Sequence, residues 1–224
     1  MEEEAVVRGY RIVFIDVDGV LNAYGLAKPA FDPEAVARFA RLLRETGATP
    51  VLSTAWRLKR QARQRVLAQL LGQGAPMPLG CTPRLRGPAR GNEVLAWLRL
   101  NTLNVYQLAE DREYRFLETP GEFEQDDYLL PARIHCAQFC VIDDRDFATA
   151  WHGGAERALL VHGHFVHTRA TRGLTERDAE RARAILSAEH GYCRRCERAL
   201  VAPVHRDAHG RLFCTGKCAR RGES

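Results

Sequence analysis

The chain has 224 residues, of which 46% are hydrophobic and 27% are charged, and its formal net charge is +5. This length leaves room for one folded domain and a small module, and the composition is typical of a soluble protein and excludes a disordered chain. The N-terminal sequence Met-Glu-Glu-Glu-Ala is acidic where a secretory signal is basic, and no apolar run approaches the roughly 20 residues that span a bilayer. We therefore expect a cytoplasmic protein that does not enter a membrane.

The first predicted element is a strand that ends in two aspartates. Residues 11–22 read Arg-Ile-Val-Phe-Ile-Asp-Val-Asp-Gly-Val-Leu-Asn, so an apolar run leads into Asp16, Asp18 and Gly19. Side chains alternate along a strand, which lets both carboxylates point the same way, and glycine permits a sharp turn. Such a pair suits a hard cation at the ligand-binding edge of an α/β sheet. Taken alone, the same residues also fit an ordinary strand-to-turn junction.

The next segment predicts a βαβ unit. Residues 34–45 have helix signals at both ends, namely Asp32, Pro33 and Gly47. The apolar run 49–52 is then a second strand, parallel to the first through a right-handed crossover. Because only 34 residues separate Asp18 from Ser53, no room remains there for a large domain covering the site.

The second strand ends in hydroxyl groups, and a helical stretch to about Leu71 follows. Ser53 and Thr54 suit the cap of that helix, and a helix N-terminus also attracts anions. A third helix is predicted to begin at Arg90, in the sequence Arg-Gly-Asn-Glu-Val-Leu-Ala-Trp-Leu. A cation there opposes the helix dipole, which indicates a purpose other than helix stability, although a solvated arginine is the alternative.

Another apolar strand ends in two adjacent acids. Residues 139–142 are apolar, and Asp143 and Asp144 follow them. Adjacent carboxylates repel each other when both are ionised, unless a cation or an arginine lies between them. A bound metal ion explains the pair economically.

The remaining segments are less informative. Residues 110–127 contain eight acidic residues and form either a small insert beside the site or a solvated loop. A further strand is predicted at 157–162. A helix is predicted over 175–190, and Gly191 ends it.

In chain order, these motifs resemble the four motifs of the haloacid dehalogenase (HAD) superfamily. The matching residues are Asp16, Ser53, Arg90, and the pair Asp143 and Asp144. The segments Leu-Ser-Thr-Ala-Trp-Arg, Arg-Gly-x-Glu-Val-x-x-Trp-Leu, Ile-Asp-Asp and Gly-Leu-Thr are similar to a HAD subgroup linked to nucleic-acid repair. The resemblance covers about residues 10–190. It implies an α/β fold in which a Rossmann-like parallel sheet carries helices on both faces.

The resemblance also implies a phosphatase site. Asp16 is the expected nucleophile, which forms an aspartyl-phosphate, and Asp18 is the expected acid and base. Ser53 would bind the phosphate, and Arg90 would offset its charge, with Arg84 and Arg86 as alternatives. The expected cofactor is Mg²⁺, bound by Asp16, the main-chain oxygen of Asp18, Asp143 and Asp144.

Five basic residues follow the second strand: Arg57, Lys59, Arg60, Arg63 and Arg65. Beside an open site they suit a large polyanionic substrate, such as a nucleic-acid end, and we expect Thr54 and Arg57 to contact the substrate. A solvated helix face and a small phosphorylated metabolite are the alternatives.

The last 32 residues contain four of the seven cysteines. They form two close pairs, Cys193 with Cys196 and Cys214 with Cys218. Two such pairs suit a tetrahedral structural Zn²⁺ site, and because so short a segment buries little core, we expect the metal to supply most of its folding free energy. His205 and His209 are alternative ligands, and a redox role of the first pair is a further alternative. The segment resembles a treble-clef or zinc-ribbon module.

We therefore expect a catalytic domain at residues 1–190, without a large cap, and a zinc module at 191–224. The module has eight Lys or Arg residues and three acids, an excess equal to the net charge of the whole chain. The other cysteines, Cys81, Cys136 and Cys140, sit in or beside apolar stretches and are expected to be free thiols, because a reducing compartment disfavours disulfides.

The predicted function is that of a Mg²⁺-dependent phosphohydrolase whose phosphorylated substrate includes nucleic-acid ends. One alternative is a non-catalytic HAD scaffold that binds nucleic acid or protein through its zinc module. A phosphotransferase and a small-metabolite phosphatase are the others.

Overall fold

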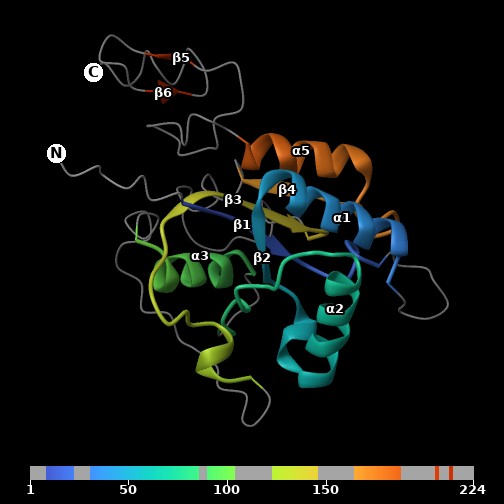
Figure 1. The fold of residues 1–224 in the computed structure, drawn as a ribbon, viewed down its shortest axis with the longest axis horizontal. Helices are drawn as coiled ribbons and strands as arrows, with labels where there is room; N and C mark the ends of the chain where they lie inside the picture. The colour runs from blue at the N-terminus through green and yellow to red at the C-terminus, as the bar shows by residue number, and fades with distance from the viewer. Residues whose placement is uncertain are drawn as a thin grey trace.

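The computed structural model describes residues 9–22, 31–85, 90–103, 123–145 and 164–187, and two short strands nearer the C-terminus. Within these residues four parallel strands form one sheet, in the order β2-β1-β3-β4 (Figure 1). The strands are β1 (Tyr10–Ile15), β2 (Ala48–Leu52), β3 (Cys136–Asp143) and β4 (Phe165–His167).

Helices cover both faces of the sheet (Figure 1). α1 (Pro33–Thr46) and α5 (Glu176–Leu186) pack together on one face, and α3 (Arg90–Asn101) packs on the other. The remaining helical elements are η1 (Ala55–Leu58), α2 (Arg60–Gly72) and η3 (Gln125–Asp127). The predicted α/β fold, with a Rossmann-like parallel sheet between helices, is confirmed.

The alternation of side chains along β1 divides the core into two parts. Val13 and Ile15 pack with apolar residues of α1 and α5, whereas Ile12 and Phe14 pack with those of α3. The rings of Phe14 and Trp97 meet edge to face, with their centroids 5.4 Å apart. Because both faces of the central strands are buried, residues 12–15 of β1 and residues 139–142 of β3 are continuous apolar runs.

The cysteines outside the tail belong to this core. Cys81, Cys136 and Cys140 are buried free thiols, as predicted. Burial raises the pKa of Cys81 to about 12 and raises the pKa of Cys140 as well. A thiol that stays protonated is a poor nucleophile, so Cys140 serves packing rather than chemistry.

The ends of α1 follow the signals in its sequence. The Asp32 side chain accepts a hydrogen bond from the N–H of Glu34, Pro33 is the first helical residue, and Gly47 closes the helix with φ 64°. The predicted helix is confirmed and is one residue longer at each end than 34–45.

Two other predicted helices differ in detail from the structure. The helical stretch after Thr54 is divided into the 3₁₀ helix η1 and the α-helix α2. α5 is capped by Thr175, as predicted, but it ends at Leu186, before the predicted end at His190. The predicted strand at 157–162 lies outside the described residues.

Several other predictions about the second half of the chain also concern residues outside the described ranges. Most of the acidic segment 110–127, the boundary at Gly191 and the four predicted zinc ligands lie outside the described residues. Near the C-terminus, the short strands β5 (His205–Arg206) and β6 (Leu212–Phe213) pair in antiparallel fashion. Among the described residues, no helix combines the length and the apolar character that crossing a membrane requires.

Candidate active site

The predicted site residues meet at the carboxyl ends of the parallel strands. The N–H of Asp16 donates to the main-chain oxygen of Ile142 at 3.0 Å, and the N–H of Ser53 donates to that of Ile15 at 2.9 Å. These bonds continue the sheet beyond β1 and β2, so Asp16 lies between Ser53 and the end of β3. Parallel α/β sheets bind their ligands at this edge.

Three carboxylates form a compact cluster at this edge. Oxygens of Asp16, Asp143 and Asp144 all lie within 4.8 Å of one another. Asp16 and Asp143 are 3% and 0% exposed. Oδ1 of Asp143 accepts a hydrogen bond from the N–H of Arg145, but its Oδ2 has no hydrogen-bond partner among the described residues. A buried carboxylate oxygen without a partner is destabilising, and a set of oxygen ligands of this kind fits Mg²⁺.

The carboxylates of the cluster repel one another. Burial and the charge of Asp16 raise the pKa of Asp143 well above its usual value, although Arg90 acts in the opposite direction. Burial and Asp16 also raise the pKa of Asp144. Additional positive charge among these groups would therefore stabilise their ionised forms.

Arg90, the first residue of α3, supplies one positive charge. Its Nη1 lies 3.7 Å from Oδ2 of Asp16, and it donates a hydrogen bond to the main-chain oxygen of Ser53. Burial opposes the charge of Arg90, but the neighbouring carboxylates, Asp16 first, outweigh burial and raise its pKa. Arg90 is only 7% exposed, so it is not a solvated surface arginine.

The two hydroxyl residues after β2 have different surroundings. Thr54 Oγ1 accepts a hydrogen bond from the N–H of Trp56 at 3.3 Å and caps η1. Ser53 Oγ is buried and has no hydrogen-bond partner among the described residues. An unpaired buried hydroxyl destabilises a protein by about 1–3 kcal/mol, which a bound phosphate oxygen would recover. Ser53 can therefore bind a ligand without giving up a hydrogen bond, whereas Thr54 is already engaged in capping η1.

Asp18 is held by two residues that the sequence motifs did not single out. Its Oδ1 accepts a hydrogen bond from Nδ2 of Asn22 at 3.0 Å, and its Oδ2 accepts one from Nε1 of Trp56 at 2.9 Å. The side chain of Asp18 is thus oriented from both sides and is not part of the three-carboxylate cluster. Trp56 stands within the segment Leu-Ser-Thr-Ala-Trp-Arg, yet nothing in that segment indicates its partner.

Gly19 allows the loop after β1 to approach the acidic cluster. Its φ is 71°, and a Cβ at this position would collide with the Asp144 carboxylate. Its main-chain oxygen accepts a hydrogen bond from Oγ1 of Thr168 at 3.0 Å. Glycine is therefore required here both for the turn and for the close contact.

Arg57 occupies a different place from the one that we expected. It is 2% exposed, and its guanidinium donates to the main-chain oxygens of Thr54, Thr82 and Pro83. It also forms an ion pair with Glu93 at 2.8 Å. Burial lowers its pKa, which Glu93 partly offsets. All three guanidinium nitrogens are engaged within the protein, which argues against direct contact with a substrate and indicates a positioning role.

The fold, the acidic cluster and the buried Arg90 define a HAD-like domain. A family model described as "HAD domain in Swiss Army Knife RNA repair proteins" matches residues 12–124, and the chain belongs to this family. The match confirms the predicted resemblance to the HAD superfamily and to its repair-linked subgroup. It includes Asp16, Ser53 and Arg90 and ends before Asp143. No curated protein and no solved structure matches the chain.

Proposed function

We propose that the chain is a Mg²⁺-dependent phosphohydrolase that removes a terminal phosphate from nucleic acid. The observation that carries the proposal is the position of buried Asp16 beside Arg90, Ser53 and the other carboxylates, where the Ser53 hydroxyl has no partner among the described residues. This arrangement offers a nucleophile, a cation and a free donor at one sheet edge. Membership in a family of HAD domains from RNA repair proteins supports the same reaction and the same class of substrate.

In the proposed reaction a carboxylate oxygen of Asp16 attacks phosphorus. The bond from phosphorus to the leaving oxygen breaks, and Asp18 donates a proton to that oxygen. A water molecule then attacks the aspartyl-phosphate, its proton passes to Asp18, and phosphate leaves. Arg90 offsets negative charge on the phosphoryl oxygens, while Asn22 and Trp56 hold Asp18 in position.

The cofactor in this proposal is Mg²⁺. Asp16, Asp143 and Asp144 would hold it, together with the main-chain oxygen of Asp18 that the family resemblance implies. A bound Mg²⁺ ion offsets charge on the phosphoryl oxygens and helps to orient them. Oδ2 of Asp143, which has no hydrogen-bond partner in the described part of the chain, is the observation that favours a metal at this place.

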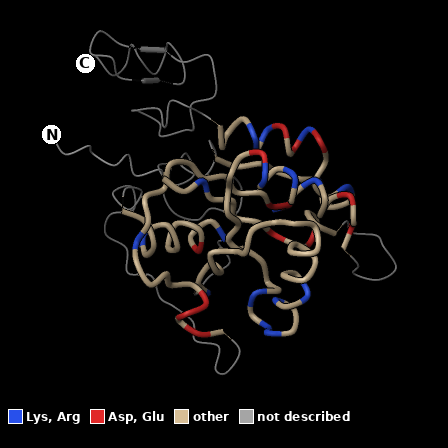
Figure 2. The backbone as a smooth tube through the Cα atoms, viewed as in Figure 1, with Lys and Arg blue, Asp and Glu red and all other residues tan. Residues whose placement is uncertain are grey.

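The proposed substrate is a phosphorylated nucleic-acid end rather than a metabolite. Lys and Arg residues gather along α2, next to η1 (Figure 2). Lys59, Arg60 and Arg65 are exposed there, so they can meet a polyanion, unlike the buried Arg57. We further propose that residues 191–224 form a separate zinc module and that the domain of residues 1–190 carries the chemistry.

The test compares Asp16→Asn with the wild type on 4-nitrophenyl phosphate and on RNA oligonucleotides phosphorylated at either end, with and without Mg²⁺. The substitution keeps the shape of the side chain and removes the nucleophile, so we expect loss of turnover on all substrates without loss of the fold. Asp32→Asn is the matched control because asparagine caps a helix as well as aspartate does. Wild-type turnover by folded Asp16→Asn protein would reject the covalent mechanism.

A further inference from the structure

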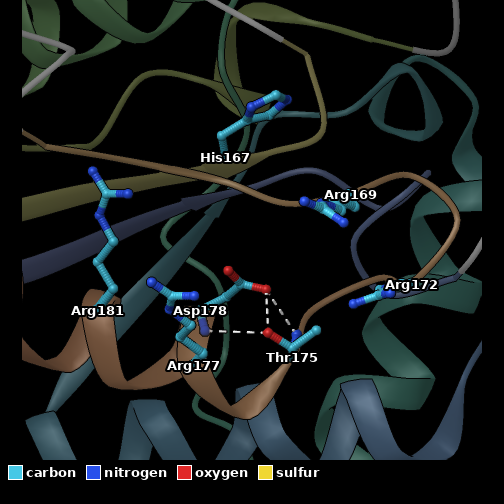
Figure 3. Close-up of a pocket in the computed structure, with 7 residues that line it drawn as sticks. All are labelled: His167, Arg169, Arg172, Thr175, Arg177, Asp178 and Arg181. Atoms are coloured by element: carbon cyan, nitrogen blue, oxygen red, sulfur yellow. Dashed lines mark hydrogen bonds between the residues drawn. The ribbon is translucent and has the colours of Figure 1, made fainter.

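A cavity of about 340 Å³ lies between the end of β4 and the start of α5 (Figure 3). Its lining includes His167 and four arginines, Arg169, Arg172, Arg177 and Arg181. Two of the arginines come from the turn before α5, and two come from α5 itself. The motifs that define the phosphatase site involve none of these residues, so the charge of this cavity needs its own explanation.

The four arginines have no acidic partner among the described residues, and all of them are exposed. The one carboxylate of the lining, Asp178, accepts hydrogen bonds from the N–H and the hydroxyl of Thr175, at 3.0 and 2.5 Å (Figure 3). Asp178 therefore takes part in capping the N-terminus of α5. By contrast, Arg38 and Arg41 on α1 both pair with Glu176. The cavity thus gathers guanidinium groups whose charge no described acidic residue offsets.

The turn that carries two of these arginines has a fixed conformation. The N–H groups of Arg172 and Gly173 donate to the main-chain oxygen of Arg169 at 2.8 and 3.0 Å, and Gly173 has φ 64°. The N–H of Leu174 donates to the main-chain oxygen of Val20 at 2.8 Å. The turn is therefore tied to the loop after β1, which belongs to the active site.

One residue of the cavity lining, His167, also contacts Asp144 of the acidic cluster. His167 lies opposite Asp143 in the register of β3 and β4, and a ring nitrogen of His167 is 2.9 Å from the main-chain oxygen of Asp144. The cavity and the cluster are therefore neighbours at one sheet edge.

We propose that this cavity binds an internal phosphodiester of the nucleic-acid strand whose end is processed at Asp16. The proposal rests on the function proposed above for the identity of the strand. Guanidinium groups bind phosphate oxygens in bidentate, charge-assisted pairs, and arginines around a cavity that have no described acidic partner provide such donors. An acidic peptide would offer carboxylates to the same groups, but the adjoining site favours a ligand that carries phosphates along its length.

The first test measures binding of the full chain to an unphosphorylated single-stranded RNA oligonucleotide by fluorescence anisotropy at several salt concentrations. The cavity variant is Arg177→Ala with Arg181→Ala, since alanine is well tolerated on an exposed helix. We expect its affinity to fall about tenfold or more, from the loss of charge-assisted hydrogen bonds. The slope of log affinity against log salt should fall by about 0.7 for each lost phosphate contact.

The matched control is Arg44→Ala with Arg133→Ala, which removes two exposed arginines away from the cavity. It should bind the oligonucleotide as the wild type does. Equal binding by the cavity variant and the wild type at every salt concentration would overturn the proposal. The proposal would also be overturned if the cavity variant lost binding to a polyglutamate peptide but bound RNA as the wild type does. The ligand of the cavity would then be an acidic peptide.

A second measurement separates this proposal from the proposed function. With phosphatase activity present, the cavity variant should lose kcat/KM on a phosphorylated oligonucleotide and keep it on 4-nitrophenyl phosphate. Equal losses on both substrates would overturn the strand-binding role. If the wild type shows no phosphatase activity, the proposed function is wrong. Weaker RNA binding by the cavity variant would then still support the cavity as a binding site for the strand.

Discussion

Asp18 accepts one hydrogen bond on each carboxylate oxygen, and the two donors come from different parts of the chain. Asn22 is on the same loop, whereas Trp56 belongs to η1 after the second strand. The Trp56 ring also packs edge to face against Phe31, with centroids 5.5 Å apart. This packing fixes the indole, and the indole in turn fixes the carboxylate that acts as acid and base in the proposed reaction.

We predict that Trp56→Phe lowers kcat on every phosphorylated substrate with little change in KM. The variant keeps an aromatic ring against Phe31 but cannot donate to Asp18, and one mispositioned proton donor reduces the rate by about tenfold or more. Steady-state kinetics provides the measurement. Trp97→Phe is the control, since Trp97 Nε1 has no hydrogen-bond partner among the described residues. A fall in both variants alike would show that Trp56 acts through packing alone.

A second prediction at this scale concerns the adjacent acids. In the absence of Mg²⁺, replacing Asp143 and Asp144 by Asn should raise the melting temperature, because it removes carboxylate repulsion at a buried site. Added Mg²⁺ should stabilise the wild type in proportion to the logarithm of its concentration and should leave the double variant unchanged. Thermal unfolding across a Mg²⁺ titration measures both effects. Equal stabilisation of the two proteins would place the metal elsewhere.

Between the elements, a buried ion pair joins Arg57 and Glu93. It joins η1 to α3, and Arg57 also ties η1 to the segment that contains Thr82 and Pro83. Arg90 leaves the same helix, α3, one turn before Glu93. The pair therefore sets the position of the helix that delivers Arg90 to Asp16.

We predict that Glu93→Gln lowers the free energy of unfolding by about 3 kcal/mol, because it leaves the charge of Arg57 buried without its partner. Urea denaturation measures the loss. Replacing both residues by Leu should recover part of it, since neither charge then remains buried. The exposed pair of Arg183 and Glu45 is the control, and Arg183→Ala should cost about 1 kcal/mol or less. A loss of similar size in both single variants would mean that burial does not decide the effect.

Elements with local signals could be predicted from the sequence, and contacts between elements could not. The cap residues around α1 act within a few positions, so Asp32 and Gly47 mark its ends. Arg57 and Arg60 look alike in sequence, but the burial of Arg57 depends on Glu93 in another helix. The order of motifs brought Asp16 and Arg90 together through the family resemblance. The pairing of Trp56 with Asp18 depends on how η1 meets the loop after β1.

For the whole molecule, the described sheet and its helices hold every predicted phosphatase residue. β1, β2 and β3 end at the site, and α5, the last described helix, ends at Leu186. The site thus draws on residues from Asp16 to Asp144 and on no described residue of the tail. We proposed above that the chemistry belongs to residues 1–190, and the described site residues all lie within that range.

The last prediction tests that division. A chain that ends at His190 should fold, bind no Zn²⁺ and hydrolyse 4-nitrophenyl phosphate as the full chain does, because the sheet and α5 are complete. The full chain should bind one Zn²⁺ through Cys193, Cys196, Cys214 and Cys218, since thiolate pairs with this spacing suit a tetrahedral site. Elemental analysis and steady-state kinetics on the two proteins measure these properties.

The same pair of proteins shows what the tail contributes to substrate binding. Its excess of basic residues predicts that the full chain binds phosphorylated RNA more tightly than the shortened chain, with a steeper dependence on salt. Absence of zinc from the full chain would reject the metal module. Loss of activity on the small substrate would make the tail part of the catalytic domain. Equal affinity and equal salt dependence of the two proteins would assign RNA binding to residues 1–190, where the arginine-lined cavity beside Asp144 already offers a place for the strand.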